Sequence, residues 1–162
     1  MAFSYNAPDV APKGALLERV VRLRGNSDYV EVAYTITPND PSAGQSYINL
    51  SSVALGSMAD ENATVLRCDR AGDISLRKHT QGSLQGASWV ALASRDGKEL
   101  FGIGWAPGEF AIVEYERKDY SLLLRLMSPP WIPGEKSHTY HVRYLYSSGA
   151  SGDRVINSLT HW

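Results

Sequence analysis

The sequence predicts an all-β fold, an antiparallel β-sandwich of roughly nine to eleven strands. Short segments in which apolar and polar residues alternate recur along nearly the whole chain. Turn-forming residues separate these segments at intervals of about 8–12 residues, the spacing typical of sandwiches and barrels. The sequence shows no alternation of strand and helix segments, so a parallel sheet is not expected.

The first predicted element is a β-hairpin. Leu16–Arg24 taken alone fits either a helical stripe or a strand, and its neighbour decides between them. Asp28–Thr37 alternates strictly, with Val30, Val32, Tyr34 and Ile36 on one face and Glu31, Ala33 and Thr35 on the other. Such alternation is typical of a half-buried strand. Because Gly25–Asp28 between the two segments has turn composition, we expect a hairpin.

A loop and further strands follow the hairpin. Pro38–Gln45 is rich in Pro, Gly, Asn and Asp, so we expect a loop there. The next strand candidates are Tyr47–Leu55, Thr64–Cys68, Asp73–Arg77 and Ala87–Ser94. Arg95–Lys98 contains an Asp-Gly pair, the strongest short-range hairpin signal in the chain. This turn is expected to join Ala87–Ser94 to Glu99–Trp105.

The C-terminal part of the chain adds three predicted strands. Turn residues at Pro107–Glu109 lead into the first of them, Lys118–Asp119 separates the first two, and Pro133–Glu135 leads into the third. We expect Pro129 and Pro130 to break the middle strand. The three strands are Phe110–Glu116, Tyr120–Leu126 and Ser137–Ser147. No internal repeat and no low-complexity run is visible, so residues 1–162 are expected to form a single domain.

Composition excludes several classes of function. The 16 basic and 17 acidic side chains nearly cancel, which argues against a binder of nucleic acid or anionic membranes, since such binders cluster positive charge. The single cysteine, Cys68, excludes an intramolecular disulfide and a cysteine-based zinc site. No apolar stretch approaches the roughly 18 residues of a membrane helix.

Targeting and cofactor motifs are missing from the sequence. The N-terminal residues show no basic region followed by an apolar one, so an intact signal peptide is not expected. The chain is expected to be either cytoplasmic or an extracellular domain excised from a larger protein, and the compartment stays open. Neither a P-loop, a Rossmann fingerprint nor a G-x-S-x-G motif occurs, so no cofactor is expected.

Aromatic residues are the first candidate binding groups. Four tryptophans and nine tyrosines supply flat apolar faces with a polar handle, which suits stacking against sugar rings. Trp105 ends a strand just before a Pro-Gly turn, and Trp131 follows a proline pair in an expected loop. We expect these two rings to bind carbohydrate. Packing in the core is the alternative for each ring and is favoured for Trp89, which lies mid-strand.

Polar residues on two predicted strands are the other candidates. Glu114 and Glu116 share a strand face about 7 Å apart, so they are weak candidates for an acid/base pair, together with His141. A charged, solvated strand face is the alternative explanation. His141 and Arg143 lie on a polar stripe of Ser137–Ser147, and with Glu116 they are expected to bind sugar hydroxyls.

Histidine spacing does not favour a metal site. His138 and His141 are three residues apart in a predicted strand, so their side chains point to opposite faces. Neither an H-x-H pair nor an HExxH run occurs. We therefore expect no bound metal.

The C-terminal half resembles a known type of domain. The segments that carry the resemblance are Ser88–Leu92, Leu100–Trp105, Leu122–Leu126, Ser128–Pro130, Pro133–Glu135 and Tyr140–Tyr144. Their succession is similar to the final strands of β-sandwiches of the galactose-mutarotase-like supersandwich type. Such domains occur in aldose epimerases and as accessory domains of glycoside hydrolases and polysaccharide lyases. The similarity covers residues 87–147, and no residue matches the catalytic His or Glu of that family.

The resemblance implies a carbohydrate-linked sandwich, and three functions stay open. The first is a non-catalytic carbohydrate-binding or accessory module, whose partner is a glycan. The second is a structural or interaction subunit that docks on a catalytic partner or on a second copy of itself. The third is a small carbohydrate-active enzyme, an epimerase, lyase or hydrolase.

Overall fold

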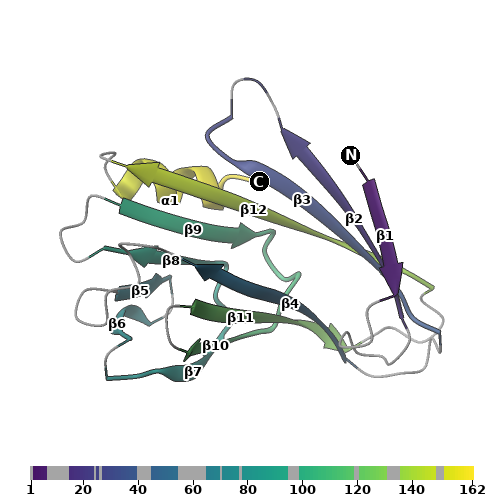
Figure 1. Cartoon of the computed structure of the whole chain (residues 1–162), viewed down its shortest axis with the longest axis horizontal. Coiled ribbons are helices and arrows are strands. Elements are labelled where there is room, and N and C mark those ends of the chain that lie inside the picture. Colours follow the sequence, from purple (N-terminus) through teal and green to yellow (C-terminus); the bar gives the residue numbers. More distant parts are fainter. Residues whose placement is uncertain are drawn as a thin grey trace.

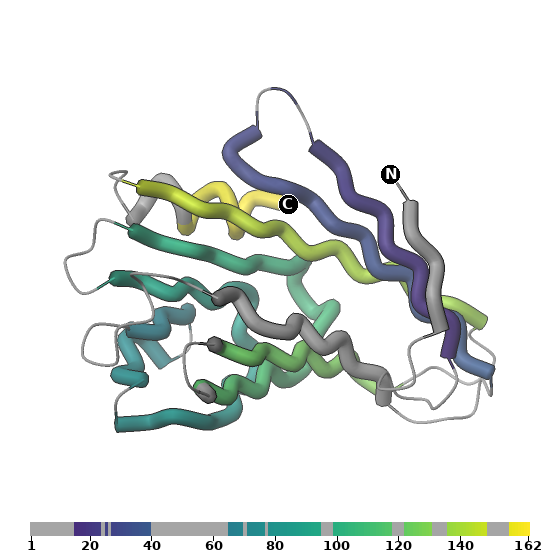
Figure 2. Tube along the Cα trace, viewed as in Figure 1, coloured from purple at the N-terminus to yellow at the C-terminus, as the bar shows by residue number. Residues whose placement is uncertain are grey.

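The structure is a computed structural model of the 162-residue chain. It describes residues 2–6, 15–23, 25, 27–39, 45–54, 65–69, 71–76, 78–94, 99–118, 121–130, 136–148 and 152–162. The strands among these residues form two sheets that face each other, and one short helix lies outside them (Figures 1 and 2).

The larger sheet has eight strands and is antiparallel throughout. Their order across the sheet is β1 (Ala2–Asn6), β2 (Leu16–Leu23), β3 (Val30–Thr37), β12 (His138–Ser148), β9 (Glu99–Trp105), β8 (Trp89–Ala93), β5 (Val65–Cys68) and β6 (Gly72–Ser75). The long strand β12 therefore lies in the middle of this sheet, between β3 and β9.

The smaller sheet has four antiparallel strands, in the order β4 (Gln45–Ala54), β11 (Ser121–Pro130), β10 (Ile112–Lys118) and β7 (Gln81–Gln85). It packs against one face of the larger sheet, and the cores of both sheets merge in one apolar cluster. The expected all-β antiparallel sandwich is confirmed.

The expected hairpins are confirmed as strand pairs. β2 pairs with β3 over eight residue pairs, from Leu16↔Thr37 to Leu23↔Val30. β8 pairs with β9, with Ala91 opposite Gly102. The Asp-Gly turn itself, residues 95–98, lies outside the described residues.

Three elements were not expected from the sequence. The segment β1 carried no strand assignment, and β7 is a polar edge strand in which only Leu84 is buried. The third is the helix α1 (Gly152–Thr160), which follows the longest strand. Its apolar residues Ile156 and Leu159 are spaced for one helix face, but so short a pattern is a weak signal.

The expectation that Pro129 and Pro130 break their strand is wrong, because β11 runs as far as Pro130. Proline lacks the N–H that a regular ladder needs, so it is tolerated only where pairing is irregular or at a strand edge. The pairing of β11 with β4 indeed becomes irregular between Met127 and Pro130. The two prolines therefore end the regular ladder, and the strand includes both of them instead of stopping at Leu126.

The core lies between the two sheets. Its fully buried side chains come from both layers, among them Ile36, Leu66, Val90, Ile103, Trp105, Val113, Leu126 and Val142. Because the side chains of a strand alternate between its faces, the odd-numbered residues of β12 point away from this core. The outer face of the larger sheet is thus available for other contacts.

Helix α1 covers part of that outer face. Figure 1 shows the helix beside β12 and β9, on the side away from the smaller sheet. Leu159 and Leu145 form a second apolar cluster there with Trp89, Ala91 and Leu100. Neither α1 nor any other described helix is long and apolar enough to cross a membrane.

Candidate functional site

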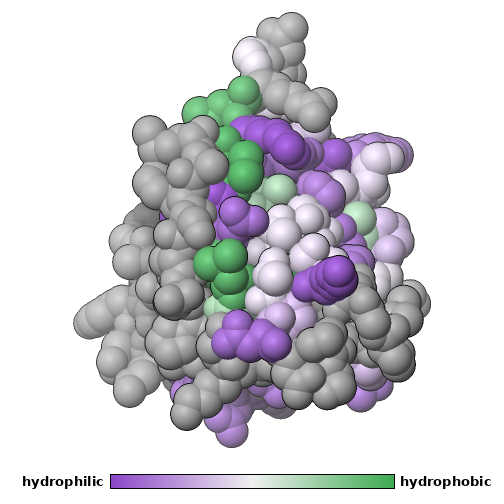
Figure 3. Space-filling view, turned by 90° about the vertical axis from the view of Figure 1, so that its right-hand side faces the viewer, coloured by the Kyte–Doolittle hydropathy of each residue, from purple (hydrophilic) through white to green (hydrophobic). Residues whose placement is uncertain are grey.

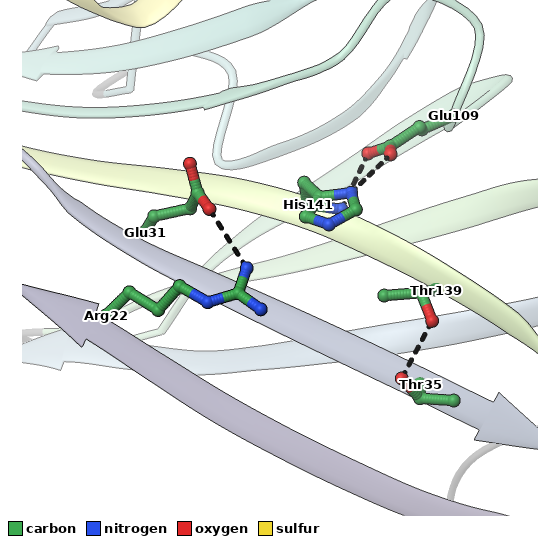
Figure 4. Close-up of polar contacts among 6 residues, drawn as sticks. All are labelled: Arg22, Glu31, Thr35, Glu109, Thr139 and His141. Carbon is green, nitrogen blue, oxygen red and sulfur yellow. Dashed lines mark hydrogen bonds and ion pairs between the residues drawn. The ribbon is translucent and has the colours of Figure 1, made fainter. Parts of the chain in front are cut away.

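The outer face of the larger sheet carries a group of polar side chains where α1 does not cover it. In the pairing of β12 with β3, Thr139 lies opposite Thr35, and Arg143 lies opposite Glu31. We call the six residues drawn in Figure 4 the polar face: Arg22, Glu31, Thr35, Glu109, Thr139 and His141. Five of them come from β2, β3 and β12, and Glu109 comes from the connection between β9 and β10.

Glu109 and His141 contact each other on the polar face (Figure 4). One carboxylate oxygen, Oε2, accepts a hydrogen bond from the backbone N–H of His141 at 2.9 Å. The other, Oε1, lies 3.3 Å from Nδ1 of the His141 ring. Strand β9 ends at Trp105, opposite Val142, so the N–H of His141 lies just past the last pair with β9. Glu109 therefore takes the place of a neighbouring strand at that point.

The two side chains differ in exposure. The Glu109 side chain is 14% exposed and that of His141 is 38% exposed. Burial raises the pKa of the Glu109 carboxyl, and the hydrogen bonds from His141 lower it by less. With Glu109 ionised, Nδ1 of His141 is the donor of this hydrogen bond, because a carboxylate oxygen can only accept one. The pair can thus accept or deliver a proton at a group bound on this face.

The connection that carries Glu109 is held by its neighbours in the chain. Phe110 is buried, stacks on Tyr140 with ring centroids 5.0 Å apart and meets Trp105 edge-on at 5.9 Å. Gly108 has φ of +83°, a conformation that glycine adopts without a steric penalty. A buried aromatic ring on one side and a glycine turn on the other therefore hold Glu109 at the edge of β12.

Two further polar contacts complete the polar face. The hydroxyls of Thr35 and Thr139 lie 2.8 Å apart across β3 and β12. Nη1 of Arg22 donates to Oε1 of Glu31 at 3.3 Å, and the Arg22 side chain is the more exposed of the two. Carboxylates, hydroxyls and an imidazole together supply both donors and acceptors, which is what the hydroxyl groups of a polyol require.

The described surface near this edge of the larger sheet is mostly polar. Figure 3 views the molecule from the side where β1 and β2 lie at the right of Figure 1. Hydrophilic residues (purple) and residues of intermediate hydropathy (white) make up most of its coloured surface, and hydrophobic ones (green) form a narrow band. The coloured part of this side therefore offers no broad apolar patch.

The stacking role expected of Trp105 is wrong. Its side chain is fully buried in the core, and its Nε1–H donates to the carbonyl oxygen of Ala87 at 3.0 Å. The ring points inward because residue 105 has the same parity as the core residue Ile103. Trp89 is also buried, in the cluster under α1. Trp131, the other ring expected to bind sugar, lies outside the described residues.

The expected grouping of Glu114 and Glu116 with His141 is not formed. The two glutamates do share a face of β10, where Arg125 lies 3.6 Å from each. That face is the outer side of the smaller sheet, because the alternate residues Val113 and Tyr115 are in the core. His141 is on the outer side of the other sheet, so the core separates these groups. Glu116 accordingly does not join the polar face.

Arg143 lies on the same face of β12 as His141, as expected, but its guanidinium is not free to bind sugar hydroxyls. The residue is only 7% exposed. Its Nη1 donates to the carbonyl oxygens of Ser158, in the last turn of helix α1, and of His161, just past the end of the helix. Arg143 therefore anchors the C-terminal segment, and a positive charge at a helix C-terminus is favourable.

No metal centre is evident in the described part of the chain. No group of three or more His, Cys, Asp or Glu side chains there is arranged to hold an ion. The ring of His138 lies 4.5 Å from that of the core residue Tyr140, whereas His141 lies on the outer face. The two histidines thus do not converge.

Sequence reasoning missed Glu109 as a functional candidate. The residue entered only as part of the Pro107–Glu109 turn, and 32 residues separate it from His141. No local pattern predicts that contact, because it depends on where the turn lies relative to β12. The signal for this contact would have been that β9 ends one residue short of His141 on the longer strand β12. The ends of strands cannot be predicted from sequence to within one residue.

Comparison with known proteins relates the fold to solved structures. No protein-family model and no curated protein matches the sequence. A proposed mutarotase (YeaD) from Salmonella typhimurium superposes with a TM-score of 0.57 at 10% identity, over 91% of this chain and 60% of that chain. A galactose mutarotase-like protein from Lactobacillus casei gives 0.54 at 11% identity, over 90% and 68%. The α-N-acetylgalactosaminidase NagBb from Bifidobacterium bifidum, solved with GalNAc, gives 0.61 at 9% identity, over 98% and 29%.

The chain has the mutarotase-like β-sandwich fold. At these identities the likeness concerns the fold alone. The chain spans 60% of the length of the Salmonella protein, and much less of the Bifidobacterium enzyme. The sequence resemblance was noted in residues 87–147. The structural likeness extends over nine-tenths or more of this chain.

Proposed function

We propose that the chain is a carbohydrate-binding module and that the sugar binds on the polar face around Glu109 and His141. The observation that carries the proposal is the grouping of a carboxylate, an imidazole and two hydroxyls on the outer face of a mutarotase-like sandwich, where the His141 side chain is 38% exposed. Solved proteins of this fold include one named a mutarotase-like protein and one solved with GalNAc, which supports a sugar as the ligand.

The chemistry of the polar face suits a neutral sugar. Hydrogen bonds from sugar hydroxyls to charged groups such as Glu109 are the stronger kind, about 1.5–3 kcal/mol each. The positive charge of Arg22 is matched by the neighbouring carboxylate of Glu31. Because this face carries two carboxylates, those of Glu31 and Glu109, beside the guanidinium of Arg22, a strongly anionic glycan has no cluster of cations to bind there.

An accessory role agrees with the way the fold occurs elsewhere. The chain matches 29% of the Bifidobacterium enzyme, so a sandwich of this type exists within a larger protein. The module is therefore expected to work beside a catalytic domain or subunit. The alternative of a pure docking subunit, with no sugar ligand, is favoured by no separate observation among the described residues and becomes an outcome of the binding test.

The test is isothermal titration calorimetry with D-galactose, D-glucose and N-acetylgalactosamine. The unmodified chain is expected to bind at least one of them. His141→Ala and Glu109→Gln should each weaken that affinity about tenfold, since each removes one charge-assisted hydrogen bond. Glu116→Gln is the matched control, because it changes a glutamate on the opposite layer and should leave the affinity unchanged.

Two results would overturn the proposal. One is that the folded chain binds none of the three sugars at millimolar concentration. The other is that Glu116→Gln weakens binding as much as Glu109→Gln does. In the first case, size-exclusion chromatography with light scattering would show whether the chain associates with itself, as a docking subunit would.

The Glu109–His141 pair also favours a second candidate, an enzyme that interconverts sugar anomers. That reaction needs one group to take the proton of the anomeric hydroxyl and another to deliver a proton to the ring oxygen. A carboxyl with a raised pKa beside an imidazole is suited to both steps. Polarimetry of freshly dissolved α-D-galactose tests this candidate: the chain should speed mutarotation, and His141→Ala should not.

A further inference from the structure

Arg143 is held between two aromatic rings at the edge of the polar face. Its guanidinium carbon lies 4.4 Å from the centroid of the Tyr29 ring and 3.9 Å from that of Trp162. The same guanidinium donates to the carbonyl oxygens of Ser158 and His161. Cation–π contact and hydrogen bonds together therefore fix the position of the last two residues, 161 and 162, over the larger sheet.

Trp162 keeps much of its surface in contact with solvent. It is 41% exposed, although one side of its ring system lies against the Arg143 guanidinium. The other two tryptophans among the described residues, Trp89 and Trp105, are buried. Within the described part of the chain, Trp162 is thus the tryptophan that offers an accessible ring.

The position of Trp162 relates it to the polar face. Arg143 and His141 are two residues apart on the same face of β12, so their β-carbons are about 7 Å apart. Helix α1 covers the face beyond Arg143, at Leu145, and the polar face begins on the other side, at His141. The Trp162 ring therefore contacts Arg143, the residue of β12 between the part that α1 covers and His141.

We propose that Trp162 is the aromatic platform on which a pyranose ring stacks while the polar face binds its hydroxyls. This inference rests on the carbohydrate binding proposed above. A pyranose presents C–H groups on one face and hydroxyls around its edge, so it needs both kinds of surface next to each other. Because Arg143 already holds the ring, little side-chain entropy is lost when the sugar binds.

Calorimetry on matched variants tests the platform. With D-galactose, D-glucose or N-acetylgalactosamine, whichever binds the unmodified chain, Trp162→Ala should lower the affinity about tenfold or more. Trp162→Phe keeps a smaller ring and should lower it less. Tyr146→Ala is the control: Tyr146 is 57% exposed and lies on β12 with the parity of the core side, so its loss should leave the affinity unchanged.

A fluorescence measurement checks the platform without relying on affinity. At saturating sugar, part of the tryptophan emission of the unmodified chain should become protected from acrylamide quenching. In folded Trp162→Phe at saturating sugar, that protected part should be missing. Protection that persists in Trp162→Phe would mean that another ring contacts the sugar, which overturns the inference.

The outcomes separate this inference from the proposed function. Sugar binding that is lost in His141→Ala but kept in folded Trp162→Ala overturns the platform and leaves the function standing. Absence of sugar binding by the unmodified chain overturns both. If Trp162→Ala unfolds, the affinity of Trp162→Phe and its quenching decide the question.

Discussion

Gly104 lies so close to Leu159 that a β-carbon at position 104 would come within 2.7 Å of the Leu159 carbonyl oxygen. Helix α1 therefore packs directly on the backbone of β9, and only glycine at position 104 allows that approach. The same close packing brings the end of α1 within reach of Arg143. The position of the C-terminal segment beside the polar face thus depends on a missing side chain.

Gly104→Ala is expected to destabilise the protein. Since the added methyl group meets backbone rather than a flexible side chain, α1 must shift, and overpacking of this kind costs about 1–3 kcal/mol in the free energy of unfolding. Urea denaturation measures the loss. Gly25→Ala is the control, because nothing lies within 4 Å of a β-carbon there. Equal unfolding midpoints for the two variants would contradict the close packing.

Replacement of Arg143 should loosen the C-terminal segment. In Arg143→Met the carbonyl oxygens of Ser158 and His161 lose a charged donor, and a loss of about 1.5–3 kcal/mol in the free energy of unfolding is expected. Hydrogen exchange should speed up at residues 156–162. Arg67→Met removes a more exposed ion pair with Asp73 and should cost less than about 1 kcal/mol. Unchanged exchange at residues 156–162 would argue against the anchoring role.

Tyr34 and Tyr144 should prove energetically coupled. Their hydroxyls lie 2.7 Å apart, and burial together with the Tyr34 hydroxyl raises the pKa of Tyr144, so the Tyr144 hydroxyl stays protonated at neutral pH. Tyr34→Phe or Tyr144→Phe leaves the other hydroxyl without this partner and should cost about 1–2 kcal/mol. A double-mutant cycle by urea denaturation is expected to show a double variant less destabilised than the sum. Strict additivity would be the contrary result.

Glu109 should make stability depend on pH. Burial raises the pKa of its carboxyl above the usual 4.5, so the folded state binds this proton more tightly than the unfolded state does. The free energy of unfolding therefore falls as pH rises from 4.5 through the folded-state pKa and then levels off. Glu109→Gln cannot ionise and lacks this fall.

The stability of Glu109→Gln relative to the unmodified chain should accordingly grow between about pH 4 and pH 7. Urea denaturation of both proteins at several pH values measures the difference. Glu114→Gln in the same series shows what removal of a more exposed carboxylate does. A difference that shrinks as pH rises would mean that the bonds from His141 outweigh the burial of Glu109.

Local alternation was enough to predict the sandwich. In β3 the residues Val32, Tyr34 and Ile36 are all buried on the core side, as their period of two predicts. The Asp-Gly pair correctly predicted that β8 and β9 are adjacent. Such signals are readable because alternation and turn chemistry depend on residues only a few positions apart.

The candidate site needed the tertiary structure. The alternating pattern predicts that Glu114 and Glu116 share a strand face, but it does not predict to which of the two sheets that face belongs. It places Trp105 at a strand end, but not in the core. Glu109 meets His141 because β9 is shorter than β12, and Trp162 meets Arg143 because Gly104 lets α1 approach the sheet. The sequence by itself determined which residues share a strand face. Packing over long sequence separations decided which faces are open and which side chains meet there, since those contacts depend on the whole chain having folded.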